Sequence, residues 1–85
     1  MSWSTYLYKE IDNEDEVIYK FTPNLSDHED LMGKIKLNKI TNMISELEPY
    51  KGDTEASEFY YNQACYCLAN CYKNKEYPDK VSRHI

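Results

Sequence analysis

The sequence contains no apolar run of the roughly 18–20 residues that a membrane-spanning helix needs. Its first ten residues lack the basic and apolar segments of a signal peptide. The motifs of phosphate-binding loops, dinucleotide-binding loops, zinc proteases and nucleophile elbows are also missing. We therefore expect a protein that is not an enzyme, that needs no cofactor and that does not enter a membrane.

Basic side chains are few, and the chain carries a formal net charge of −5. Residues 1–30 contain two lysines and eight acidic side chains, so the negative charge is concentrated there. An acidic protein gains nothing from phosphate attraction, and we expect no direct binding to nucleic acid. The charge favours encounter with a basic protein partner instead.

Three cysteines, Cys65, Cys67 and Cys71, are an odd and closely spaced set that does not suit a disulfide framework. They indicate a reducing compartment, and we expect the protein in the cytoplasm. The length of 85 residues predicts one small domain, 1–85, with a limited core.

Aromatic and β-branched residues dominate 3–11 and 16–21, on either side of a polar segment at 12–15. This pattern predicts a β-hairpin over about 3–21 with a four-residue turn. Alternation places Leu7, Ile11, Val17 and Phe21 on the core face, together with Trp3. The 3–11 strand would be an edge that a second chain can pair with.

The next segment has a capping-box pattern, in which Ser26 is followed three residues later by Glu29. It predicts a helix, or a pair of helices, over about 27–47. Gly33 favours a break, so one helix and two helices both remain open. The apolar stripe of this helix would consist of Leu31, Ile35, Ile40, Met43, Ile44 and Leu47.

The main helix is predicted over about 54–75, capped by Asp53 or Thr54. At 100° per residue its apolar arc includes Ala64, Cys67, Leu68 and Cys71, and a short helical turn follows at 78–85. The predicted fold class is therefore α+β, with an N-terminal β-hairpin packed on two or three helices.

The stretch LANCYKNKEYPDKV resembles the helix–turn–helix junction of a tetratricopeptide repeat, and the resemblance covers 60–85 only. The turn is one residue shorter than in that family and lacks its glycine. The resemblance implies a helical hairpin of a kind that serves protein binding. The residues that match the family positions are Leu68, Ala69, Tyr72, Tyr77, Val81 and Ile85.

Cys67 and Cys71 share one face of the main helix, whereas Cys65 lies roughly 160° from Cys67. A metal site would need a histidine to complete it, and there is no second close pair of ligands. We expect all three cysteines to pack as small apolar residues and no metal to be bound.

The sequence predicts two partner-binding features. The first is an aromatic pair with a polar rim on the back of the main helix, and the second is the acidic hairpin turn, which would steer a basic partner. Alternatively, the hairpin or the first helix covers the aromatic pair, and the acidic residues serve solubility. The predicted partner-binding residues are Phe59, Tyr66, Asn62, Gln63 and Asn70 on the helix, and Asp12, Glu14 and Asp15 in the turn.

By elimination we expect a small acidic protein that binds and inhibits or neutralises a partner protein, such as an immunity protein, an antitoxin or a phage-encoded antagonist of a defence system. A structural or adaptor module is the alternative. A metal-binding regulator that uses the cysteines is a third hypothesis. The sequence leaves open whether the protein is a monomer or a homodimer.

Overall fold

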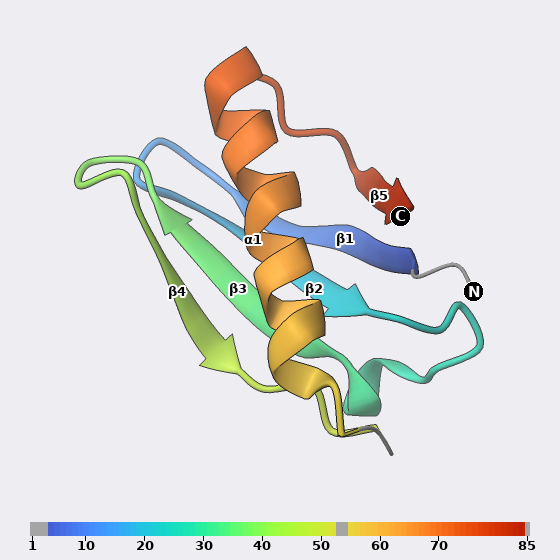
Figure 1. The fold of residues 1–85 in the computed structure, drawn as a ribbon. Helices are drawn as coiled ribbons and strands as arrows, with labels where there is room; N and C mark the ends of the chain where they lie inside the picture. Colours follow the sequence, from blue (N-terminus) through green and yellow to red (C-terminus); the bar gives the residue numbers. More distant parts are fainter. Residues whose placement is uncertain (1–3, 53–54, 85) are drawn as a thin grey trace.

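The computed structural model describes residues 4–52 and 55–84, so the predictions that involve Trp3, Asp53, Thr54 and Ile85 lie outside the described residues. Five antiparallel strands form a single sheet in the order β4-β3-β2-β1-β5, and one helix, α1, crosses one face of it (Figure 1). The predicted packing of a hairpin on two or three helices is therefore wrong. The elements are β1 (Ser4–Asp12), β2 (Glu16–Thr22), the 3-10 turn η1 (Glu29–Leu31), β3 (Gly33–Asn38), β4 (Met43–Glu48), α1 (Ser57–Asn74) and β5 (Lys80–His84).

The predicted N-terminal hairpin is present as β1 and β2. Its turn is shorter than predicted and spans 13–15, where the Asn13 side chain accepts hydrogen bonds from the backbone N–H groups of Asp15 and Glu16 at 2.9 and 3.0 Å. This local bonding suits asparagine in a turn. In the sheet β2 is the central strand, and it lies between β1 and β3.

A β-bulge in β1 makes the core face of this strand differ from the predicted one. Leu7, Val17 and Phe21 are fully buried, as predicted, but Ile11 is 39% exposed. The register shifts between Lys9 and Ile11 and places Ile11 opposite Ile18. An extra residue in one strand reverses the faces of the residues beyond it, so Ile11 points away from the core.

A second hairpin, β3–β4, stands where one or two helices were predicted over 27–47. In β3 the buried Ile35 and Leu37 alternate with the half-buried Lys34 and Lys36, which is the period of a strand. The connecting turn is closed by the Asn38 side chain, which accepts hydrogen bonds from the backbone N–H groups of Ile40 and Thr41.

The predicted capping box belongs to a loop rather than to a helix start. The backbone N–H and the hydroxyl of Ser26 both donate to the Asn24 side-chain oxygen, at 3.0 and 2.9 Å. The short turn η1 follows, with His28 as an N-cap that makes no side-chain hydrogen bond. Serine and asparagine favour such local bonds in turns as much as at helix ends, which explains the wrong prediction.

The main helix is confirmed as α1, and Lys75 ends it in the left-handed conformation with φ 58°. Its inner face packs on the side of the sheet that carries the buried side chains of β1, β2 and β3. The core consists of Leu7, Val17, Tyr19, Phe21, Ile35 and Leu37 from the sheet and Ala64, Cys67 and Leu68 from the helix.

After α1 the chain returns along the sheet and forms β5 against β1. The predicted helical turn at 78–85 and the helical hairpin implied by the tetratricopeptide resemblance are therefore wrong. The buried Leu7 pairs with Val81, and the Tyr19 hydroxyl donates to the Pro78 carbonyl at 2.6 Å. β1 is consequently an inner strand, and the two edges of the sheet are β4 and β5.

Candidate functional site

The outer face of α1 carries a hollow that we call the aromatic hollow, with a volume of about 580 Å³. Four of the five helix residues predicted to bind a partner lie in it, and Asn70 does not. Ile44 of β4 contributes to the same hollow, which was not expected because 27–47 was predicted as helix. The lining residues are Ile44, Phe59, Asn62, Gln63, Cys65, Tyr66 and Ala69.

The two aromatic residues of this hollow differ in exposure. Tyr66 is 58% exposed, whereas Phe59 is half-buried and meets the Tyr60 ring edge-on at a centroid distance of 5.5 Å. The alternative that a first helix covers both rings is excluded, because β3 and β4 occupy that part of the chain. Tyr66 is thus available to solvent.

Arg83 of β5 contacts two residues of the aromatic hollow, Tyr66 and Gln63. Its guanidinium carbon lies 5.2 Å from the centroid of the Tyr66 ring, and its Nε donates to the Gln63 side-chain oxygen at 2.6 Å. Gln63 was predicted on the solvated face but is only 8% exposed, since Arg83 covers it. This hydrogen bond could not be predicted from the sequence, because β5 was not predicted as a strand.

The β4 edge and the turn before it carry further exposed apolar side chains, which do not line the aromatic hollow. Ile40 in the β3–β4 turn is 73% exposed, Met43 is 68% exposed and Leu47 is 44% exposed. All three were predicted to be core residues of a helix. Exposed apolar residues that cluster on one edge of a sheet are typical of an interaction surface.

The acidic turn lies beside this edge. The backbone N–H of Lys39 donates to the Asp15 carbonyl at 2.8 Å, so the β1–β2 and β3–β4 turns are side by side at one end of the sheet (Figure 1). The Lys39 ammonium donates to Asp12 at 2.7 Å, and this hydrogen bond lowers the pKa of the Asp12 carboxyl. Glu14 and Asp15 are exposed.

The acidic residues do not form one large patch. Asp27, Glu29 and Asp30 lie in the loop that follows β2, while Asp12, Glu14 and Asp15 lie at the turn that precedes it. The seven residues of β2 separate the two groups by about 20 Å. The turn with Glu14 and Asp15 is therefore the acidic feature next to the apolar β4 edge.

The cysteines lie mainly in the core. Cys67 and Cys71 are buried and Cys65 is half-buried. Burial raises the pKa of all three thiols, that of Cys67 to about 11. Among residues 4–52 and 55–84 no three histidine, cysteine or acidic side chains lie close enough together to hold a metal ion.

In the part of the chain that the structure describes, no helix is both long and apolar enough to cross a membrane. Comparison with protein-family models, curated proteins and solved structures finds no match to the chain.

Proposed function

We propose that this protein works without catalysis, by binding a partner protein and inhibiting or neutralising it, in the manner of an immunity protein, an antitoxin or a phage anti-defence protein. The observation that carries the proposal is the 58% exposure of Tyr66 in a hollow that it shares with Phe59 and Ile44. A rigid aromatic side chain beside apolar and amide groups is the usual anchor of a protein–protein interface.

The surface favours a partner that offers both apolar and basic groups. Ile40 in the β3–β4 turn and Met43 of β4 add exposed apolar side chains at this edge of the sheet, with Met43 on the opposite face of β4 from Ile44. Exposed acidic side chains lie on the same strand and at the neighbouring turn, namely Glu46 on β4 and Glu14 and Asp15 in the β1–β2 turn. Such an arrangement attracts a basic partner over a distance and then holds it by apolar contact.

The state of the cysteines supports a binding role in the cytoplasm. All three are free, and their raised pKa values keep them protonated at neutral pH, which suits packing better than nucleophilic chemistry. A reducing compartment preserves three unpaired thiols.

Affinity capture with immobilised protein tests the proposal, with Tyr66→Ala against wild type and Lys73→Ala as a matched control on the exposed end of the same helix. We expect wild type and Lys73→Ala to retain one partner that Tyr66→Ala loses. The isolated partner should then lose activity in proportion to added wild-type protein, with an end point at one equivalent. Equal capture by all three proteins, or a partner whose activity does not change, would contradict the proposal.

A homodimeric adaptor is the second candidate, and it is favoured by the outer edge of β4, which pairs with no other described strand. If two copies pair antiparallel about Ser45, Met43 faces Leu47 of the second copy and no two acidic side chains face each other. Light scattering over a concentration series tests this candidate. A dimer that Met43→Lys dissociates supports it, and a monomer at all concentrations rejects it.

A further inference from the structure

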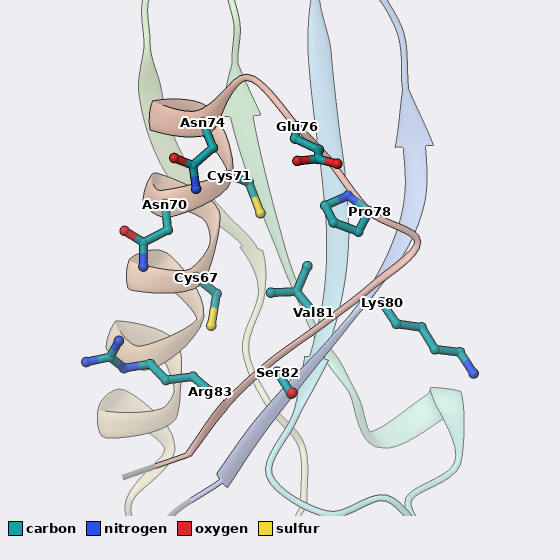
Figure 2. A pocket seen from close by; sticks show the side chains of 10 residues that line it. All are labelled: Cys67, Asn70, Cys71, Asn74, Glu76, Pro78, Lys80, Val81, Ser82 and Arg83. Atoms are coloured by element: carbon teal, nitrogen blue, oxygen red, sulfur yellow. The ribbon is translucent and has the colours of Figure 1, made fainter.

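A second hollow lies on the opposite side of α1, between the helix and β5 (Figure 2). Its volume is about 240 Å³, and the segment that leads from α1 into β5 closes one end of it. We call it the α1–β5 groove. Its walls include Cys67, Asn70, Cys71 and Asn74 of α1 and Val81 and Arg83 of β5.

The outer wall of this groove is the backbone of β5, whose outer edge pairs with no other strand among the residues that the structure describes. The Lys9 N–H donates to the Asp79 carbonyl at 2.8 Å, and in an antiparallel pair such bonded positions recur at every second residue. Val81 and Arg83 therefore direct their backbone groups toward β1. Lys80 and Ser82 direct theirs outward, and both residues also line the groove.

The charges of β5 differ in sign from those of the chain as a whole. β5 contains Lys80 and Arg83 and no acidic residue, while the net charge of the protein is −5. Of the neighbouring acids, Asp79 is ion-paired with Lys9 at 3.2 Å, and Glu76 lies at the closed end of the groove. An incoming chain meets positive charge along this edge.

We infer that the α1–β5 groove binds an extended acidic segment of a partner protein, which adds to β5 as an antiparallel strand. Strand addition at a sheet edge takes its affinity from main-chain hydrogen bonds and its specificity from alternate side chains. The site lies at the opposite edge of the sheet from β4, so the inference goes beyond the proposed function and does not depend on it.

The pleat of β5 determines which side chains the segment should carry. Val81 faces α1, so the residue opposite Val81 enters the groove between the Cys67 and Cys71 thiols and should be small and apolar. Lys80 points to the other face of the sheet, so the residue opposite Lys80 should be acidic. A segment in which small apolar and acidic residues alternate fits both conditions.

A fluorescently labelled heptapeptide of alternating valine and glutamate is the probe, and the lysine-for-glutamate peptide is its control. Ser82→Pro removes one outward N–H and leaves the pairing with β1 intact, because proline is tolerated in an edge strand where the N–H faces solvent. Ser82→Ala keeps this N–H. Lys80→Glu reverses the charge that should select the acidic peptide.

Fluorescence anisotropy should show that the glutamate peptide binds wild type and Ser82→Ala, and that the lysine peptide binds neither. Ser82→Pro and Lys80→Glu should each weaken binding about tenfold or more, with unchanged circular dichroism. Nuclear magnetic resonance should show that the amide protons of Lys80 and Ser82 exchange fast in the free protein and slowly with peptide. No binding at millimolar glutamate peptide, or equal binding by Ser82→Pro, would overturn the inference.

Discussion

Gly33 lies at the start of β3, directly across from Phe21 of β2. A Cβ atom at this position would meet the Phe21 ring and would lie 2.9 Å from the Glu48 carbonyl oxygen. The glycine that suggested a helix break is thus a place where an aromatic ring rests on the backbone. The missing side chain of Gly33 therefore allows β2, β3 and β4 to pack closely at this point.

We predict that Gly33→Ala destabilises the protein by about 1–3 kcal/mol, because the buried Phe21 ring has no room to move away. Urea denaturation followed by circular dichroism measures the change. Ser45→Ala on the exposed neighbouring strand is the control and should stay within about 0.5 kcal/mol of wild type. An unchanged midpoint for Gly33→Ala would show that Phe21 repacks freely.

Because of Cys67, the free energy of unfolding should decrease at alkaline pH. Burial raises the pKa of its thiol from 9.0 to about 11, so the folded state holds this proton more tightly than the unfolded chain. The resulting stabilisation is complete below the unfolded pKa and is lost as pH rises through the folded one. One thiol shifted by two pKa units contributes at most about 3 kcal/mol.

We therefore expect the free energy of unfolding to decrease between about pH 9 and 11, and to decrease less in Cys67→Ala. Urea titrations under reducing conditions at several pH values measure both slopes. The variant has a lower stability at neutral pH because it loses a buried sulfur, so the comparison concerns slopes only. Parallel curves for the two proteins would assign the alkaline loss to other groups.

At the scale of elements, the β3–β4 turn depends on one unusual backbone conformation. Asn42 has a φ of 63°, and its N–H donates to the Asn38 carbonyl at 2.7 Å. Asparagine and glycine adopt this left-handed region readily, while β-branched residues do not. This conformation leaves Ile40 exposed to solvent, next to the acidic β1–β2 turn.

We predict that Asn42→Val lowers stability by about 1–2 kcal/mol and that Asn42→Gly changes it little. Thermal unfolding by calorimetry distinguishes the two variants. If both variants lose stability equally, the Asn42 side chain rather than its φ angle supports the turn.

Three elements, β1, β2 and α1, could be predicted from the sequence because their patterns are local. Alternation around Leu7 and Val17 is unambiguous, and the helix pattern extends over 18 residues. Helical periodicity also brought together Phe59, Asn62 and Tyr66, because one angle per residue determines a helix face. Neither prediction needed knowledge of distant contacts.

The other strands were missed because their apolar residues have two possible periods or distant partners. Ile35, Ile40 and Ile44 suit a helical stripe as well as strands joined by a turn, and Ile40 is in fact exposed. β5 has Val81 as its only inward apolar side chain, and it pairs with a strand more than 70 residues earlier. Consequently Ile44 and Arg83 were absent from the predicted site.

At the scale of the whole molecule, alternating charges cross the face of the sheet that α1 leaves open. Lys20 contacts both Glu10 and Glu29, and Lys34 contacts both Glu10 and Glu48. Hydrogen bonds from lysines lower the pKa values of three carboxyls, those of Asp12 from Lys39, Glu29 from Lys20 and Glu48 from Lys51. These ion pairs connect β1, β2, β3, β4 and the 3-10 turn on the face of the sheet opposite to α1.

We predict that acid weakens the fold through these carboxyls. Because their folded pKa values are lowered, the stabilisation is present above about pH 4.5 and is lost as pH falls through the folded pKa values. Urea midpoints at neutral pH and at decreasing acidic pH, in low and high salt, measure the loss. High salt should reduce it because the pairs are exposed, and an identical loss in both salts would contradict this cause.

Ser4 lies opposite His84 in the register of β1 and β5, and the Ser4 hydroxyl and the His84 ring nitrogen are 2.8 Å apart. A short linker between these two positions would turn the most distant strand pair into a local hairpin. New ends then fit in the β3–β4 turn, where Ile40 is 73% exposed. Such a circular permutant keeps every strand neighbour, but it makes β4 the first strand and β3 the last, so the long-range closure of the sheet moves from the β1–β5 pair to the β3–β4 pair.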